Sequence, residues 1–221
     1  MRRKVLMTVI TAMMMGVIFS GCGEKASEVP VDEKTAIEAG FSDGTSEGVL
    51  DTSEQLSGKH HAEIVIKDYG TISVELDADS APITVTNFVN LAQEGFYDGL
   101  TFHRIMDGFM MQGGDPLGNG TGGASEKIKG EFASNGVDNG LSHTKGAISM
   151  ARSSAPDSAS SQFFIVETDS TFLDGEYAVF GYVTEGIEIV EQICADAKPT
   201  DNNGSIKKDE QPVMETVTII D

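Results

Sequence analysis

The sequence predicts a mainly β protein, a closed antiparallel β-barrel accompanied by two helices. Short apolar runs, several of them alternating with polar residues, recur from residue 62 to the end of the chain. Only two stretches repeat apolar residues at helical spacing, and the connecting segments are rich in turn-forming Gly, Ser, Asp and Asn. Many short strands with few helices favour a barrel, because closing a sheet removes its exposed edges.

Strands are expected where these short runs stand between turn residues. Residues 68–70 are expected to join the first two strands as a hairpin. A long Gly-rich loop is expected at 115–146 and a polar loop at 195–211. In chain order the expected strands are 62–66, 72–76, two within 102–115, 146–150, 162–166, 177–183 and 216–220.

Two helices are expected at separate points of the chain. Pro82 suits the first position of a helix, because its missing N–H needs no partner there. Apolar residues then recur at helical spacing, and Gly95 is a suitable end. A second helix is expected where Ile187, Val190 and Cys194 share one face.

One expected hairpin, residues 102–115, carries an arginine among large apolar residues. It is expected to turn at 107–108, and strict alternation puts Phe102, Arg104 and Met106 on one face of its first strand. The faces of its second strand carry Phe109, Met111 and Gly113 on one side, and Met110 and Gln112 on the other. Burying a guanidinium beside apolar groups is costly unless it is paired, so this hairpin is a candidate functional site.

Length and composition limit the possible functions. The chain has 221 residues, enough for one domain with a tail, and its 39% hydrophobic content is sufficient for a full core. The formal charge of −20 argues against nucleic acid or anionic lipid headgroups as partners, since both need Lys and Arg to neutralise them. The two cysteines, Cys22 and Cys194, form no CxxC pair or Cys/His cluster, so no zinc site is expected.

Residues 1–21 are expected to be a secretory signal peptide. A basic start at residues 2–4 precedes an apolar stretch, 5–19, that is short for a bilayer span. The Phe-Ser-Gly-Cys sequence at 19–22 resembles the motif at the end of bacterial lipoprotein signal peptides. In those proteins the signal peptide is cut before the cysteine, and the cysteine is lipidated. That resemblance implies a lipid on Cys22 and a protein anchored to the bacterial cell membrane outside the cytoplasm. An uncleaved anchor and ordinary signal cleavage are the alternatives.

Residues 22–59 are rich in Gly, Ser, Thr, Asp and Glu and contain few large apolar groups. Such a segment cannot bury a core, so it is expected to be a flexible acidic tether from the lipidated cysteine to a domain of residues 60–221. An acidic tail that binds a partner is the alternative. If Cys22 carries a lipid, Cys194 is expected to be a lone thiol on the second helix.

Several local motifs indicate chemistry only weakly. Residues 118–123 match G-x-G-x-x-G, but no hydrophobic strand precedes them and no helical pattern follows, so a dinucleotide site is not expected. The chain lacks HExxH and G-x-S-x-G, so neither a zinc protease nor a serine hydrolase is indicated. His103 alternates with its neighbours and is expected to face away from Arg104 as a structural residue.

The strongest pattern is a series of short blocks in a fixed order. They are FHRI at 102–105, GFMMQGGD at 108–115, NGTGG at 119–123, SMA at 149–151, SQFFI at 161–165, FLDG at 172–175 and VFG at 179–181. In content and order they resemble the cyclophilins, a family of peptidyl-prolyl cis–trans isomerases, over residues 62–221. The resemblance implies an eight-stranded antiparallel barrel capped by two helices, and isomerisation of X–Pro bonds as its activity.

Isomerisation of an X–Pro bond is slow because amide resonance must be lost, with a barrier of about 18–20 kcal/mol. In the twisted transition state the proline nitrogen regains a lone pair. A donor aimed at that nitrogen binds the twisted state more strongly than either planar isomer. The reaction therefore needs no covalent intermediate, no cofactor and no metal.

By this resemblance Arg104 is the donor, since its charge is permanent and its planar fork directs two bonds. Phe109 and Gln112 complete the expected catalytic set, and Gln112 binds the substrate carbonyl and orients the arginine. The proline pocket carries over to Phe109, Met110, Phe164 and Leu173. Further substrate-binding positions are Ala151, Gln162 and the main chain of Arg152, with Phe172 and Tyr177 at the pocket edge.

Three positions around the expected proline pocket depart from the common cyclophilin pattern. Arg152 stands where many members have Asn, Phe172 where many eukaryotic members have Trp, and Tyr177 where His is common. The last two changes resemble bacterial members.

The sequence therefore predicts a membrane-tethered isomerase that acts on proline-containing exported polypeptides and assists their folding. It is expected to be a monomer and not to bind nucleic acid. Two other functions remain open: a non-catalytic peptide-binding or chaperone module on the same barrel, and a lipoprotein that binds a small solute.

Overall fold

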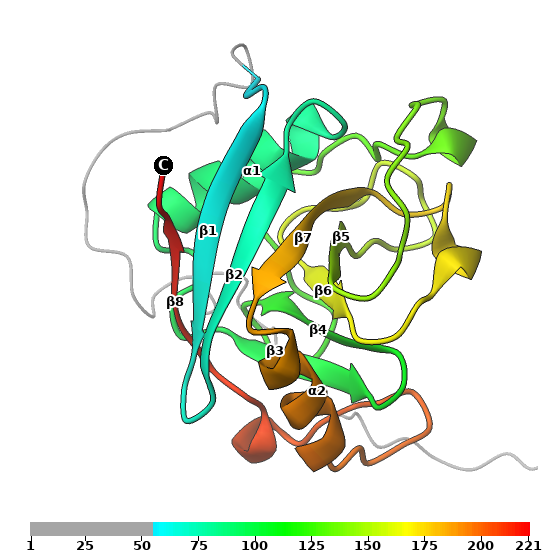
Figure 1. The fold of residues 1–221 in the computed structure, drawn as a ribbon. Coiled ribbons are helices and arrows are strands. Elements are labelled where there is room, and N and C mark those ends of the chain that lie inside the picture. The colour runs from blue at the N-terminus through cyan, green and yellow to red at the C-terminus, as the bar shows by residue number, and fades with distance from the viewer. Residues whose placement is uncertain (1–54) are drawn as a thin grey trace, which may run out of the picture. The chain divides into compact units, whose positions relative to one another are not determined.

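The computed structural model describes residues 55–221; the predicted signal peptide, the lipidation site and nearly all of the tether lie outside the described residues. The described part forms eight strands and two α-helices (Figure 1). The strands are β1 (Lys59–Ile66), β2 (Gly70–Asp77), β3 (Thr101–Met106), β4 (Met110–Asp115), β5 (Ala147–Met150), β6 (Phe163–Val166), β7 (Val179–Glu185) and β8 (Met214–Ile219). The helices are α1 (Pro82–Gln93) and α2 (Ile187–Asp196). Every strand and helix expected from the sequence is present, with small differences at the ends.

All eight strands belong to one antiparallel sheet in the order β3-β4-β6-β5-β7-β2-β1-β8. The prediction of a closed barrel is wrong: β3 and β8 are edges, and the sheet is a curled half-barrel. At the seam the described residues form an isolated bridge between Thr101 and Val213. The N–H of Gly99 donates to the carbonyl of Met214, and the N–H of Met214 to that of Leu100, both at 2.8 Å. Pro212 accepts a hydrogen bond from the N–H of Phe102 at 3.0 Å but has no N–H to donate back, so the ladder is interrupted there.

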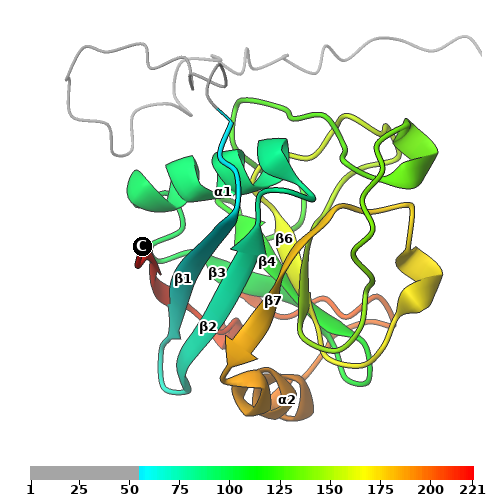
Figure 2. The same cartoon turned by 45° about the horizontal axis from the view of Figure 1, so that its top comes forward.

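The two helices lie at opposite ends of the curled sheet (Figures 1 and 2). Phe88 of α1 lies in an aromatic cluster of the main core, with ring centroids 5.1 Å from Tyr97, 5.5 Å from Phe163 and 5.3 Å from Phe180. Ahead of β1, Leu56 also packs against this core. In residues 55–221 neither α1, α2 nor any shorter helix is long and apolar enough to cross a membrane.

The β3–β4 hairpin departs from strict alternation at a β-bulge. The register shifts around His103, so Phe102 turns into the main core while Arg104 and Met106 lie on the opposite face. The prediction that all three of Phe102, Arg104 and Met106 share a face is therefore wrong for Phe102. A bulge adds one residue to one strand, which reverses the faces that follow it.

Phe109 departs from the predicted pattern on the second strand of this hairpin. It lies in the turn before β4 and packs in the same outer apolar cluster as Met110, while Met111 faces the main core. The prediction that Phe109 shares the face of Met111 is wrong, because alternation begins only with the first residue of the strand. Two adjacent large apolar residues are therefore available on the outer face.

The N-terminus of α1 is capped by a distant residue. No side chain next to the helix caps it, and the carboxylate of Glu131 accepts hydrogen bonds from the N–H groups of Ile83 at 3.0 Å and Thr84 at 2.7 Å. The hydroxyl of Thr84 donates to the same carboxylate at 2.6 Å, and Glu131 is only 2% exposed. A carboxylate suits this place because the first N–H groups of a helix lack partners and carry partial positive charge.

Replacing Glu131 by alanine is expected to lower the free energy of unfolding by about 2–3 kcal/mol, because buried donors lose a charged acceptor. Urea unfolding followed by circular dichroism measures the change. Glu126→Ala, at an exposed position of the same loop, is the control and should change stability by less than about 0.5 kcal/mol. Equal effects of the two variants would show that the cap does not stabilise the fold.

Candidate active site

A second apolar cluster lies on the face of the sheet opposite the main core. In β6, Phe163 and Ile165 face the main core while Phe164 and Val166 face this outer cluster, as the period of two requires. Its buried members are Met110, Ala147, Phe164, Val166 and Val179, and its partly buried members are Met106, Phe109, Leu141, Ala151, Leu173, Tyr177 and Tyr182. All the residues of the predicted proline pocket are therefore brought together in one cluster.

Aromatic rings form much of the outer cluster. The ring of Phe164 lies edge-on to Tyr177 with centroids 6.0 Å apart, and it stacks on His143 at 5.9 Å. At the rim, the ring of Phe109 lies 5.8 Å from that of Phe172, which is 73% exposed. The cluster thus presents an accessible apolar surface of a kind that suits a proline ring.

Arg104 projects from β3 at the border of this cluster. Its Nε–H donates to the carbonyl of Asn203 at 2.7 Å, and its Nη1–H donates to Oε1 of Gln112 at 3.2 Å. The remaining contacts are with sulfur atoms, Nη2 to Met106 at 3.2 Å and Nη1 to Met110 at 3.9 Å. Burial lowers the pKa of Arg104, but a guanidinium stays charged at neutral pH. Since thioether sulfur is a weak acceptor, the N–H groups on that side remain weakly engaged.

Gln112 and Gln162 form a hydrogen-bonded relay beside the arginine. The Nε2–H of Gln112 donates to Oε1 of Gln162 at 3.0 Å, and the Nε2–H of Gln162 donates to the carbonyl of Gly122 at 2.7 Å. Each amide uses its oxygen as acceptor and its nitrogen as donor, so the relay has one direction. It therefore keeps the side-chain oxygen of Gln112 turned toward Arg104.

The turn that holds Arg104 through Asn203 was not identified from the sequence. The carboxylate of Asp201 accepts from the main-chain N–H of Asn203 at 2.9 Å, and from the N–H and hydroxyl of Ser205 at 3.1 and 2.9 Å. These bonds, the main-chain bond of Ser205 first, lower the pKa of Asp201. The Asp-Asn-Asn-Gly pattern at 201–204 is a turn signal, but nothing in it indicates contact with a strand far away.

Two hollows flank the site and meet at Gln112. One, of about 780 Å³, is lined by Arg104, Gln112 and loops 117–121 and 203–211. His103, expected to be structural, is buried and also lines this hollow. The other, of about 250 Å³, is lined by residues that include four predicted site positions, Gln112, Ala151, Arg152 and Gln162. The expected groove residues are therefore continuous with the outer cluster.

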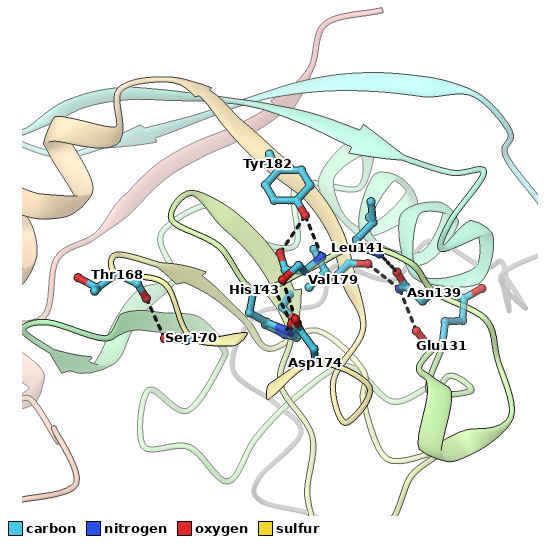
Figure 3. A network of polar contacts seen from close by, with 11 residues as sticks. Glu131, Asn139, Leu141, His143, Thr168, Ser170, Asp174, Val179 and Tyr182 are labelled. Carbon is cyan, nitrogen blue, oxygen red and sulfur yellow. Dashed lines mark hydrogen bonds and ion pairs between the residues drawn. The ribbon is translucent and has the colours of Figure 1, made fainter. Parts of the chain in front are cut away.

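A polar network supports the rim of the outer cluster (Figure 3). His143 lies 2.8 Å from Asp174 through Nδ1 and 3.0 Å from the hydroxyl of Ser149 through Nε2. Its main-chain N–H donates to Asp174 at 2.7 Å, and its carbonyl accepts from the N–H of Ser170 at 2.7 Å. These are the residue types of a hydrolase triad, but His143 and Ser149 are fully buried. The network therefore serves to clamp the segment 168–178, which carries Phe172, Leu173 and Tyr177.

The network in Figure 3 continues through the loop before His143. The side-chain amide of Asn139 donates to the carbonyls of Glu131 at 2.9 Å and Val179 at 2.8 Å. The hydroxyl of Tyr182 accepts from the N–H of Ser142 at 3.0 Å and donates to its carbonyl at 2.8 Å. The loop that caps α1 is therefore connected to the rim of the site by these side chains, and the main-chain N–H of Ser134 adds a hydrogen bond to the carbonyl of Gly175 at 2.9 Å.

A curled antiparallel sheet with an arginine and two glutamines beside an aromatic cluster defines a cyclophilin-like protein. A family model described as Cyclophilin type peptidyl-prolyl cis-trans isomerase/CLD matches residues 61–221. Peptidyl-prolyl cis-trans isomerase B of Bacillus subtilis is 43% identical over 145 residues, covering 66% of this chain and 92% of the relative. The peptidyl-prolyl cis-trans isomerase of Helicobacter pylori is 48% identical over 126 residues, covering 56% and 74%.

A solved structure agrees with these relatives. The crystal structure of a Cryptosporidium parvum cyclophilin-type peptidyl-prolyl cis-trans isomerase, determined in the presence of the dipeptide Ala-Pro, has a TM-score of 0.64 at 29% identity. The match covers 73% of this chain and 99% of the Cryptosporidium parvum chain. The chain belongs to the cyclophilin-type peptidyl-prolyl cis–trans isomerase family.

Acidification is expected to weaken the clamp at His143. Burial lowers the pKa of His143 below its ordinary value of about 6.5, so the unfolded chain binds a proton that the folded protein does not. The free energy of unfolding should therefore fall as the pH drops below about 6.5.

Urea unfolding at about pH 7 and pH 5 tests this, comparing the protein with His143→Asn. The variant is expected to be less stable at neutral pH and to lose less stability on acidification. Some pH dependence should remain, because burial also lowers the pKa of His103. An unchanged slope in the variant would contradict the assignment.

Proposed function

We propose that this chain accelerates cis–trans isomerisation of X–Pro bonds in exported polypeptides and so assists their folding outside the cytoplasm. The position of Arg104 carries the proposal. Strong neutral acceptors on Asn203 and Gln112 hold the guanidinium, while among residues 55–221 its N–H groups toward the outer cluster meet only methionine sulfurs. A permanent donor is thus held beside a surface that suits a proline ring.

In this proposal the proline ring of the substrate lies on Phe109, Met110, Phe164 and Leu173. The guanidinium of Arg104 then donates to the proline nitrogen when the peptide bond twists and the nitrogen becomes pyramidal. The planar isomers offer no such acceptor, so the interaction strengthens in the transition state and lowers the barrier. In the transition state an N–H group of Arg104 donates to this nitrogen in place of a methionine sulfur. The nitrogen is the better acceptor, and the arginine does not have to move.

The rest of the peptide is proposed to run past Gln112 toward Ala151 and Arg152. Gln112 lines both hollows, so it lies where an extended chain has to pass. Among residues 55–221, the main-chain N–H of Arg152 forms no backbone hydrogen bond, which leaves it available for a β-type contact.

The location is proposed from the sequence. A signal peptide of residues 1–21, a lipid on Cys22 and a tether of residues 22–59 anchor the isomerase domain to the outside of the bacterial cell membrane as a monomer. The acidic, Gly- and Ser-rich composition of the tether favours an extended linker that lets the domain reach emerging polypeptides.

Arg104→Ala is expected to lower kcat/KM for an X–Pro peptide by about 100-fold, because a transition-state donor is lost. Arg104→Lys should recover little, since an ammonium lacks the planar fork. Two-dimensional NMR exchange on a proline-containing peptide measures the rates. Lys145→Gln is the control: it removes one positive charge from an exposed ion pair with Glu191 and should leave the rate unchanged.

The same assay separates the other functions. Normal exchange in Arg104→Ala would exclude the role given to Arg104. Binding of proline peptides by the wild-type protein without acceleration would favour a non-catalytic binding or chaperone module. A thermal shift with small solutes and none with proline peptides would favour a solute-binding lipoprotein.

Cys22→Ala is expected to abolish incorporation of labelled palmitate in bacterial cells and to move the protein from the membrane fraction to the soluble fraction, because Cys22 is the proposed site of lipid attachment. Cys194→Ser is the control and should keep the label, since Cys194 is buried in α2. Membrane retention of the unlabelled Cys22→Ala protein would indicate an uncleaved anchor instead.

A further inference from the structure

The side chain of Arg152 is enclosed at the rim of the outer cluster. Its guanidinium carbon lies 4.7 Å from the ring centroid of Tyr177 and 4.9 Å from that of Phe132. The side chain is only 12% exposed. A guanidinium is planar and weakly hydrated, so it stacks on aromatic faces at lower cost than an ammonium. Two rings from separate loops are therefore joined through one arginine.

Hydrogen bonds fix the guanidinium in this place. The Nε–H donates to the carbonyl of Glu176 at 3.0 Å, and Nη1 donates to the carbonyls of Ser153 at 3.0 Å and Ser154 at 3.4 Å. Because Glu176 directly precedes Tyr177, the bond to its carbonyl and the ring contact hold the same short segment. The side chain thus ties the loop after β5 to the segment that carries Tyr177.

Tyr177 in turn borders the predicted proline pocket. Its ring lies edge-on to Phe164 at an interplanar angle of 86° and edge-on to His143 at 85°. Phe164 is a buried member of the outer cluster and a neighbour of Gln112 across β4 and β6. A shift of Tyr177 therefore changes the space available beside Phe164.

We infer that Arg152 is a positioning residue for the proline site: its side chain holds Tyr177 against Phe164 and so sets the shape of the pocket wall. This inference rests on the proposed function, in which the outer cluster receives the proline ring. The side chain of Arg152 acts through Tyr177 and does not touch the reacting atoms. Only its main chain lies along the path of the peptide.

The geometry assigns this role to the shape of the guanidinium and not to its charge alone. Within residues 55–221 Arg152 forms an ion pair with Glu176 alone, at 3.4 Å, and the Glu176 side chain is 55% exposed. Exposed ion pairs contribute little and are screened by salt. Lysine would keep the charge but lose the planar stack and most of the directed hydrogen bonds.

Steady-state isomerase kinetics of Arg152→Gln and Arg152→Lys test the inference. Arg152→Gln is expected to raise KM for an X–Pro peptide by about 5-fold and to change kcat by less than about 2-fold, and Arg152→Lys should behave in the same way. Glu176→Gln, which removes only the ion pair, and Lys145→Gln, which removes a distant charge, are the matched controls and should match the wild type. Full recovery by lysine, or an equal effect of Glu176→Gln, would overturn the inference in favour of charge.

A double-mutant cycle with Tyr177→Leu separates positioning from general stability. If Arg152 acts through Tyr177, Arg152→Gln combined with Tyr177→Leu raises KM no further than Tyr177→Leu alone. Multiplying effects would show that the two residues act independently and would refute the inference. Thermal unfolding of each variant confirms that the compared proteins are folded at the assay temperature.

The ring contact itself is measured without substrate. Nuclear Overhauser contacts between Tyr177 and Phe164 are expected in the wild type and in Glu176→Gln, and they should weaken in Arg152→Gln and Arg152→Lys. If these contacts persist in both Arg152 variants of an active enzyme, the positioning role is wrong and the proposed function stands. If the wild type does not accelerate isomerisation but the contacts weaken as expected, the proposed function fails and the positioning of Tyr177 is supported.

Discussion

Arg104 keeps a positive charge at the border of an apolar cluster, and within residues 55–221 no carboxylate forms an ion pair with it. Removing a cation from water is costly unless hydrogen bonds replace the lost hydration. Asn203 and Gln112 provide these bonds from two different segments, and each is held by further hydrogen bonds of its own. A carboxylate here would bind the guanidinium more strongly and would occupy the donors that a substrate needs.

The sheet makes this arrangement possible because alternate residues of the same strands serve two separate clusters. One set fills the inside of the half-barrel, and the other, including Met110 and Phe164, forms the outer cluster. The bulge at His103 adjusts this alternation so that Phe102 packs inside and Arg104 remains outside. The rigid interior therefore fixes the positions of Arg104 and of the side chains in the outer cluster.

The rim of the outer cluster is built from long loops. Polar side chains fix these loops in place, as backbone hydrogen bonds between strands fix the sheet. Glu131 joins one loop to α1, and the contact of His143 with Asp174 joins another to the segment that carries Leu173. Arg152 adds a third link through Tyr177. Leaving a buried polar group without a hydrogen-bond partner is costly, so each of these links favours one conformation of its loop. The pocket wall thereby acquires a single shape despite having little regular secondary structure.

The sequence by itself determined the position of nearly every strand and helix, because the periods of apolar residues and the turn residues between them are local properties. The ordered blocks around Arg104, Gln162 and Leu173 also indicated which residues the fold brings together. Only the tertiary structure decided that the sheet stays open at Pro212 and that Phe102 and Arg104 face apart. It alone revealed the bond from Arg104 to Asn203, which are 99 positions apart, and the pairing of His143 with Asp174, which are 31 apart. Such contacts depend on how distant segments meet in space, and no local pattern of residue types encodes that meeting.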